Sequence, residues 1–214
     1  MKELYFTKQN IDLFSKNMIK EIKSSKIIKK SFDLSNSALL IIDMQKYFTD
    51  NLSHAFVPSS QAIILKIKEL TGLFLCKKRP IIFTRHIDKK YKNNMLLKWW
   101  HHTINKNDNL SHIDERVFIE KSPVIIKTQY DAFYKTNLDS VLKKYKVKRV
   151  FISGVVANLC CETTARSSFV RGYEVYFGVD TTAAYCFKHH MATLINISMG
   201  FGVPFIVEDV LNAN

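Results

Sequence analysis

Four residues have side chains that could carry covalent catalysis, and each of them follows an apolar run. Asp43 and Lys127 come directly after such runs, and Cys160 and Cys161 lie shortly after a run that ends at Gly154. A thiol becomes a nucleophile when a nearby base takes its proton, and a lysine can stabilise the charge on either group. The combination therefore indicates nucleophilic catalysis by a cysteine.

Each of these side chains also has a structural interpretation. Asp43 could cap a helix, Lys127 could be the solvated end of a strand, and the two cysteines could be small core residues. The segment after Gly154 favours catalysis, because it leads from an apolar run through a tight turn into a predicted helix. A thiol there faces free amides and the positive end of the helix dipole, which favour the thiolate. We therefore expect Cys160 to be the only fast-reacting thiol at neutral pH.

The elements that must position these residues follow from an alternation of short apolar runs with helical patterns. Strands buried on both faces read as continuous apolar runs, as in parallel sheets covered by helices. The sequence predicts an α/β protein, a three-layer α/β/α Rossmann-like fold with a six-stranded, mainly parallel sheet, whose ligands collect at the carboxyl ends of the strands. The predicted strands span residues 37–43, 80–86, 124–127, 149–154, 174–179 and 203–207.

Helices are predicted between these strands and at the N-terminus. Apolar residues spaced three to five apart among lysines predict an amphipathic helix over 7–30, within an N-terminal helical extension of about residues 1–35. The segment 87–121 is irregular and rich in aromatic residues and histidine. The further helices are predicted at 60–77, 138–146, 158–171 and 189–199.

Three motifs carry a resemblance to a known family. The residues Asp43-Met44-Gln45-Lys46-Tyr47-Phe48, the single residue Lys127 and the segment 154–165 resemble, in this order, the signatures of the isochorismatase-like cysteine hydrolase superfamily. The stretches 53–58, 84–86 and 99–100 resemble one subfamily of that group. The resemblance covers nearly the whole chain and predicts a single isochorismatase-like hydrolase domain over residues 1–214.

The resemblance implies an Asp-Lys-Cys triad that hydrolyses a small amide, ureide or carbamoyl compound through a covalent thioester. By position, Asp43 would be the general base and later the acid, Lys127 its electrostatic partner, and Cys160 the nucleophile. The backbone amides of Val156 and Cys160 would form the oxyanion hole. The family also commonly has a non-proline cis peptide at this turn, which would join Val155 to Val156.

Aromatic residues on the segments around the triad are candidates for the substrate pocket. Ala157 stands where many amidase relatives have a threonine, so this chain is not expected to present that threonine hydroxyl to the substrate. Cys161 is expected to be a packed helix residue. Tyr130 lies on a segment that could also wall the pocket. The predicted substrate-binding residues are Phe48, His86, Trp99, Trp100, Phe133 and Ala157.

The sequence shows no set of residues that could together bind a metal ion directly. Metal-dependent nicotinamidases of this superfamily carry an Asp-x-His ligand pair that the segment 53–56 lacks, and His86 alone cannot form a metal site. These departures argue against a nicotinamidase. We therefore expect no metal and no other cofactor, and we expect hydrolysis to survive exhaustive chelation.

The composition and charge of the chain limit the kinds of partner that it can have. The 214 residues carry a net charge of +13, but the lysines are spread along the chain, so we expect no nucleic-acid partner. We expect a small-molecule substrate, and the basic charge should attract anionic substrates. The absence of a signal-like N-terminus and of any run of 18 apolar residues predicts a cytoplasmic protein with no membrane partner. The N-terminal helix and the aromatic segment offer apolar surface that predicts a homo-oligomer, a dimer or a tetramer.

Three functions remain open on the sequence. The first is a cysteine hydrolase that cleaves a carbon–nitrogen bond. The second is an isochorismatase that hydrolyses a vinyl ether, for which the resemblance implies Asp43 as the acid and no need for the thiol. The third is a catalytically idle binding protein on the same fold, against which the intact set of Asp43, Lys127 and Cys160 argues.

Overall fold

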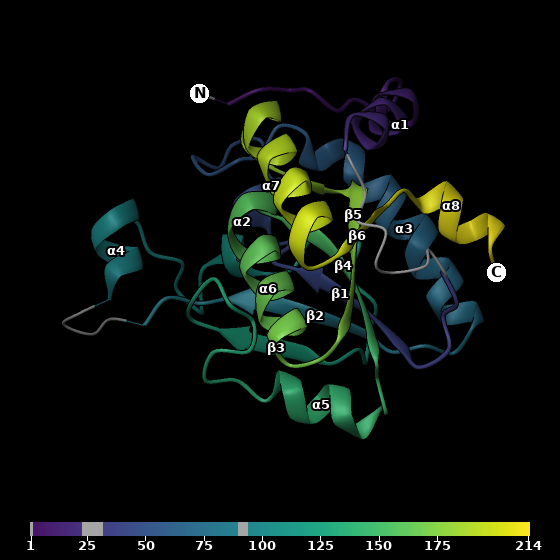
Figure 1. Cartoon of the computed structure of the whole chain (residues 1–214). Coiled ribbons are helices and arrows are strands. Elements are labelled where there is room, and N and C mark those ends of the chain that lie inside the picture. The colour runs from purple at the N-terminus through teal and green to yellow at the C-terminus, as the bar shows by residue number, and fades with distance from the viewer. Residues whose placement is uncertain (1, 23–31, 90–93) are drawn as a thin grey trace.

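The computed structural model describes residues 2–22, 32–89 and 94–214, and a six-stranded sheet forms its centre (Figure 1). The strands lie in the order β3-β2-β1-β4-β5-β6, and all neighbouring pairs among these six strands are parallel. The predicted three-layer α/β fold is therefore confirmed, with a wholly parallel sheet. The strands are β1 (Ser37–Ile42), β2 (Ile81–His86), β3 (Val124–Lys127), β4 (Arg149–Val155), β5 (Glu174–Ala183) and β6 (Val203–Phe205).

The order of the strands reverses between β1 and β4. After β1 the chain continues toward β2 on one side, and after β4 it continues toward β5 on the other side. The loops that follow β1 and β4 therefore run in opposite directions away from each other. In doubly wound sheets such a point opens a crevice at the carboxyl ends of the strands. The register pairs Ile42 with Gly154, so Asp43 and the turn after Val155 begin side by side at this crevice.

Helices cover both faces of the sheet. Figure 1 shows α3 and α8 on one face and α6 and α7 on the other. Helix α3 turns the buried residues Ile63, Ile67 and Leu70 toward the sheet at helical spacing, which is the pattern of an amphipathic helix leaning on a core. The longer helices are α1 (Ile11–Glu21), α3 (Ser60–Cys76), α5 (Leu138–Lys144), α6 (Glu162–Val170) and α7 (Phe187–Gly200), and the short helix α8 spans Val207–Asn212.

Several predicted bounds were wrong. Helix α1 spans Ile11–Glu21 within the predicted range 7–30, and residues 23–31 lie outside the described part of the chain. Strand β5 runs four residues beyond its predicted end, because its polar residues Asp180, Thr181 and Thr182 are buried and hide the strand from an apolar pattern. Three short helices were not predicted, since they are too brief to show a period: α2 (Lys46–Thr49), α4 (Met95–Trp100) and α8.

Gly154 is the position where the sheet itself demands glycine. Its φ of 112° lies in the region that L side chains rarely adopt. A Cβ atom there would lie 2.0 Å from the carbonyl oxygen of Ile42, the last residue of the neighbouring strand. The close approach of β4 to β1 beside Asp43 therefore depends on the missing side chain.

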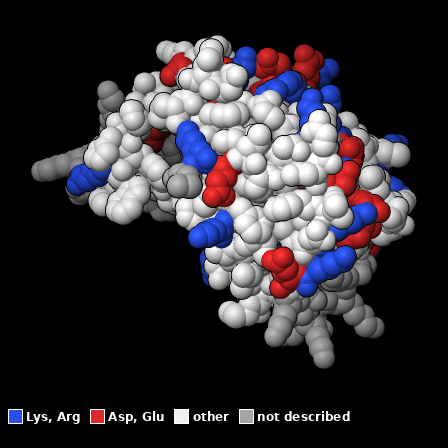
Figure 2. All heavy atoms as spheres, turned by 90° about the horizontal axis from the view of Figure 1, so that it is seen from above, with Lys and Arg blue, Asp and Glu red and all other residues white. Residues whose placement is uncertain are grey.

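The surface mixes charges of both signs. Figure 2 shows lysine and arginine side chains interspersed with aspartate and glutamate over the face seen from above. Within the described part of the chain, no helix is long and apolar enough to cross a membrane.

Candidate active site

Three side chains from separate strand ends meet in the crevice. The Nζ atom of Lys127 lies 2.7 Å from Oδ2 of Asp43 and donates a hydrogen bond to Sγ of Cys160 at 3.3 Å. It also donates to the carbonyl of Gln129 at 2.8 Å. Asp43 and Lys127 are fully buried, and Cys160 is 6% exposed. The structure thus brings together the three residues that the sequence proposes as a triad.

The carboxylate of Asp43 is held from two sides. Asp43 follows β1 with a φ of 46°, and the hydroxyl of Thr84 on β2 donates to its Oδ1 atom at 2.6 Å. The backbone N–H of Asp43 donates in turn to the Thr84 hydroxyl oxygen at 3.0 Å. Lys127 forms an ion pair with the other carboxylate oxygen, Oδ2. The charge of Asp43 raises the pKa of the Cys160 thiol, so this carboxylate lies close enough to the sulfur to serve as its base.

Cys160 lies in a wide helical turn between β4 and α6. Residues 157–161 form a π-helical turn, in which the N–H of Cys161 donates to the Val156 carbonyl at 3.3 Å, five residues back. The N–H of Leu159 donates to the same carbonyl at 3.0 Å. The peptide between Val155 and Val156 is cis, in agreement with the expectation from the family. The turn carries the sulfur into the crevice at the amino end of α6.

The structure does not favour a resting thiolate. The pKa of the Cys160 thiol is raised to about 12, chiefly by burial; the charge of Lys127 lowers this pKa and the charge of Asp43 raises it, but neither effect matches that of burial. The expected stabilisation by the helix terminus and Lys127 is therefore outweighed by loss of solvent. The sequence could not indicate this, since burial depends on every segment around the sulfur. At neutral pH Cys160 is a neutral thiol beside a base.

The remaining charges of the site are consistent with this state. Burial alone would lower the pKa of Lys127, but the neighbouring charges of Asp43 and Cys160 outweigh it and raise the pKa above its usual value. Lys127 is therefore a permanent cation. Burial also raises the pKa of Cys161 well above its usual value, and Cys161 is fully buried, in keeping with the expected packing role.

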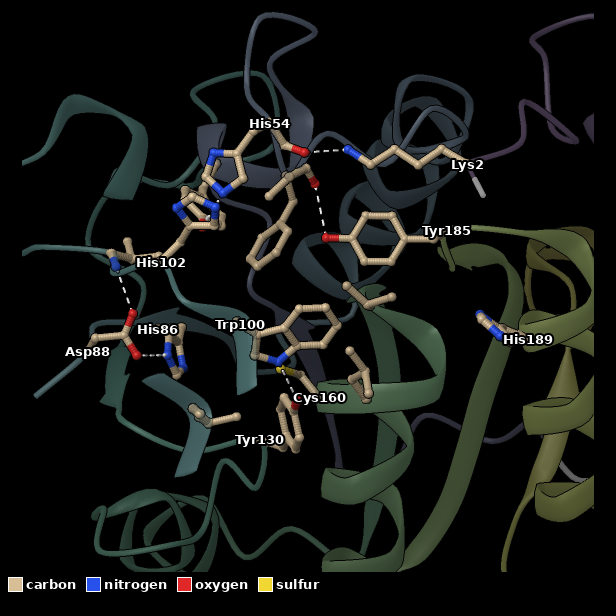
Figure 3. A pocket seen from close by; sticks show the side chains of 17 residues that line it. Lys2, His54, His86, Asp88, Trp100, His102, Tyr130, Cys160, Tyr185 and His189 are labelled. Carbon is tan, nitrogen blue, oxygen red and sulfur yellow. Dashed lines mark hydrogen bonds and ion pairs between the residues drawn. The ribbon is translucent and has the colours of Figure 1, made fainter. Parts of the chain in front are cut away.

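A cavity of about 350 Å³ opens in front of Cys160 (Figure 3). Its size is typical of a pocket for a small molecule. One group of its lining residues is apolar or aromatic: Phe48, Leu96, Trp100, Ile104, Tyr130 and Leu159. A second group is polar or charged: Lys2, His54, His86, Asp88, His102 and His189.

Of the predicted substrate-binding residues, Phe48, His86 and Trp100 line the cavity, and three others do not. Trp99 is 72% exposed, because it occupies the outward side of the short helix α4. Phe133 is buried elsewhere, under the guanidinium of Arg171. Ala157 is fully buried and lies outside the cavity wall, whereas Val156 and Cys160, whose amides are the predicted oxyanion donors, belong to that wall.

His86 and Asp88 form a pair in the cavity wall (Figure 3). Nε2 of His86 lies 3.0 Å from Oδ1 of Asp88, and the other carboxylate oxygen accepts the N–H of Ile104 at 2.7 Å. Within the described part of the chain, the buried Nδ1 atom of His86 has no hydrogen-bond partner. A buried polar atom without a partner costs free energy, so this nitrogen is available to a substrate.

Sequence reasoning missed several members of the wall. Asp88 carried a usable signal, since it comes two residues after His86 at the end of a strand. Lys2 and Tyr185 carried none, because they reach the cavity from the start of the chain and from the end of β5. Across residues 2–22, 32–89 and 94–214, no group of three metal-ligating side chains is found.

Comparisons with known proteins agree with one another. A family model described as the isochorismatase domain matches residues 37–209. The chain is 35% identical to nicotinamidase 3 of Arabidopsis thaliana over 77% of this chain and 82% of that protein. It is 25% identical to enterobactin synthase component B of Escherichia coli over 86% of this chain and 65% of that protein.

Solved structures share the fold. A cysteine hydrolase from Pseudomonas syringae superposes with a TM-score of 0.81 at 24% identity, over 89% of this chain and 98% of that one. A pyrazinamidase of Pyrococcus horikoshii, solved in complex with zinc, superposes with a TM-score of 0.70 at 24% identity, over 80% of this chain and 99% of that one.

Proposed function

The chain belongs to the isochorismatase family of hydrolases, and we propose that it is a cysteine hydrolase of small amides, ureides or carbamoyl compounds. The observation that carries the proposal is the contact of Lys127 Nζ with both Asp43 Oδ2 and Cys160 Sγ in the wall of a cavity. The bond cleaved is the carbon–nitrogen bond next to the carbonyl group. The contacts of Asp43, Lys127 and Cys160 and the membership of a hydrolase family argue against an idle binding protein.

In the first half of the reaction the thiol proton of Cys160 passes to Asp43 as the sulfur attacks the carbonyl carbon. The transfer accompanies the attack, since a thiol with a pKa of about 12 does not ionise beforehand. The carbonyl oxygen becomes an oxyanion, for which the amides of Val156 and Cys160 are the proposed donors. When the carbon–nitrogen bond breaks, Asp43 returns the proton to the leaving nitrogen and a thioester remains.

In the second half a water molecule hydrolyses the thioester. Asp43 takes one proton from the water while the hydroxyl attacks the acyl carbon, and the sulfur leaves and recovers its proton from Asp43. Lys127 stays charged throughout and stabilises the negative charge that moves between Asp43 and Cys160. The acid product and the resting thiol result, so no bond change is left unbalanced.

A second candidate is the hydrolysis of a vinyl ether. It is supported by the raised pKa of Cys160, which keeps the sulfur neutral, and by the similarity to enterobactin synthase component B. In this reaction Asp43, once protonated, would transfer its proton to the vinyl carbon. Water would add to the resulting oxocarbenium carbon and return a proton to Asp43, and the hemiketal so formed would break its carbon–oxygen bond and release the alcohol. The sulfur would then be a bystander.

One assay of two variants separates the candidates. The purified protein is screened for ammonia release from a panel of small amides and ureides, including nicotinamide, with isochorismate alongside, and the screen is repeated after chelation. For an amide substrate, Cys160→Ala and Asp43→Asn should both abolish turnover, and a thioester adduct should appear after acid quench. Retained amide hydrolysis in Cys160→Ala excludes the covalent mechanism. For a vinyl ether, Asp43→Asn should be inactive while Cys160→Ala keeps substantial activity.

A further inference from the structure

The N-terminal segment contributes one residue to the cavity in front of Cys160, and that residue is a lysine. Lys2 is the only lysine or arginine among the described residues that line this cavity. Its Nζ atom donates to the carbonyl of His54 and lies 5.4 Å from the ring centre of Tyr185 (Figure 3). Lys2 is an exposed residue, but both partners of its ammonium group are uncharged and belong to the cavity wall, so its charge lies at the cavity without an ion pair.

The segment that carries Lys2 is fixed in place. The N–H of Glu3 donates to the carbonyl of Tyr185 at 2.8 Å, and the Glu3 carboxylate accepts the N–H of Phe187 at 2.9 Å. Tyr5 and Phe6 are buried, and both of their N–H groups donate to the hydroxyl of Ser59. These bonds from Glu3, Tyr5 and Phe6 fix the backbone beside Lys2 against the wall of the cavity.

The ammonium group of Lys2 has no acidic partner among the described residues. Within the described part of the chain Lys2 forms no ion pair, and Asp88 is the only acidic residue of the cavity wall. Both carboxylate oxygens of Asp88 are occupied, by His86 and by the N–H of Ile104. The neighbouring His54 adds no charge at neutral pH, because burial and the charges of His102 and Lys2 lower its pKa.

We infer that the cavity takes a substrate with a carboxylate group, which Lys2 recognises while the carbonyl to be attacked lies at Cys160. This inference rests on the proposed function for the identity of the reacting bond. The aromatic side chains of Phe48, Trp100 and Tyr130 contact the uncharged part of such a molecule, and the ammonium group of Lys2 pairs with its carboxylate. The substrate class is therefore a small amide or ureide of an acid that keeps a second, ionised carboxyl group.

The test compares two reagents that alkylate the same sulfur and differ in charge. Iodoacetate and iodoacetamide each form a sulfur–carbon bond with Cys160, release iodide and leave the thiol proton to solvent. The ratio of their rate constants at Cys160 cancels the ionisation of the thiol. It is measured on the full chain at pH 8.5 by mass spectrometry of the Cys160 peptide. In Lys2→Gln we expect the preference for iodoacetate to fall about fivefold, and in the wild type we expect it to weaken with salt.

The matched control is Lys8→Gln. Lys8 is an exposed lysine of the same N-terminal segment and does not line the cavity, so this variant removes the same charge elsewhere. The exposed Cys76 provides a reference thiol in every sample. An unchanged ratio at Cys160 in Lys2→Gln, or an equal fall in Lys8→Gln, overturns the inference.

This readout is independent of turnover, so the two proposals can fail separately. An enzyme that hydrolyses no amide can still show the charge preference, and an active amidase can lack it. For each amide hydrolysed in the screen, a carboxylate-bearing substrate is also compared with its neutral carboxamide, for example 3-carbamoylbenzoate with isophthalamide. The ratio of kcat/KM should favour the anion and should fall in Lys2→Gln through a higher KM, whereas Lys2→Arg should restore it.

Discussion

At the scale of single residues, the ionisation of Cys160 depends on two neighbours of opposite charge. Burial raises the pKa of the thiol most, the charge of Lys127 lowers it, and the charge of Asp43 raises it. The carboxylate also occupies Lys127, which would otherwise pair with the thiolate. The same aspartate that can take the proton during attack therefore reinforces burial in keeping the sulfur neutral before a substrate arrives.

We predict that Asp43→Asn makes Cys160 more reactive toward alkylation while it abolishes turnover. Removal of the carboxylate charge lets Lys127 pair with the thiolate, so the pKa of Cys160 falls, and a fall of one unit means about tenfold faster alkylation below the pKa. Iodoacetamide labelling at pH 8, followed by peptide mass spectrometry, measures the rate relative to the exposed Cys76.

In the wild type the same experiment should label Cys76 before Cys160, the reverse of the order expected from sequence. Cys161 is fully buried and should stay unlabelled in both proteins. Alkylation of Cys160 that is slower in Asp43→Asn than in the wild type would contradict this account of the thiol.

At the scale of elements, the site depends on how closely the carboxyl ends of β1 and β4 approach. The paired residues Ile42 and Gly154 end the shared ladder, and Asp43 and the π-helical turn follow directly. Strand β5 makes a different contact three residues before its last residue. There both carboxylate oxygens of Asp180 accept the N–H of Val207, the first residue of α8, at 3.2 and 3.0 Å.

We predict that Gly154→Ala destabilises the protein far more than Gly172→Ala does. Both glycines have positive φ, but an added Cβ at Gly172 meets no atom within 4 Å, whereas at Gly154 it meets the Ile42 carbonyl oxygen at 2.0 Å. Strain alone should cost Gly172→Ala about 1–2 kcal/mol of unfolding free energy. Gly154→Ala should lose this and several kcal/mol more, as measured by urea denaturation. Equal losses would show that the two strands separate without cost.

We predict that Asp180→Asn stabilises the protein at pH 8 but not at pH 4. Burial raises the pKa of Asp180 to about 7, above its value in the unfolded chain, so its contribution is fully present at low pH and is lost as the pH rises through 7. A shift of about three units corresponds to at most about 4 kcal/mol. Asparagine keeps an acceptor for the Val207 N–H and carries no charge.

The measurement for Asp180 is the difference in unfolding free energy between variant and wild type at pH 4, 6 and 8. The exposed Glu120 supplies a matched control, Glu120→Gln, which removes a carboxylate without changing a buried one. If the difference in unfolding free energy between variant and wild type is the same at pH 4, 6 and 8, the ionisation of Asp180 does not contribute to the pH dependence of stability.

At the scale of the whole molecule, the cavity is assembled from segments far apart in the chain. Its wall includes Lys2, Tyr130 and Tyr185, and the indole N–H of Trp100 on α4 donates to the Tyr130 hydroxyl at 2.7 Å. Figure 1 shows α4 standing out from the rest of the molecule. On this helix Met95 is 62% exposed and Trp99 is 72% exposed.

We predict that the protein is a homo-oligomer and that α4 contributes to the contact between its copies. Large apolar side chains on a projecting helix lose contact with water when a second copy covers them. Sedimentation of the 24.9 kDa chain should give a dimer or a tetramer, and Trp99→Ser should shift the equilibrium toward smaller species. A stable wild-type monomer with full activity would refute the prediction.

Local pattern determined the strands, the main helices and the three residues proposed for catalysis, because apolar runs, helical spacing and residue type are properties of neighbours in the chain. The family resemblance added the roles proposed for Asp43, Lys127 and Cys160. Only the tertiary structure decided that the pKa of Cys160 is raised, that Trp99 and Phe133 lie outside the cavity, and that Lys2 belongs to it. These properties depend on burial and on distances between segments separated by up to the length of the chain, and neither quantity can be obtained from the order of residues alone.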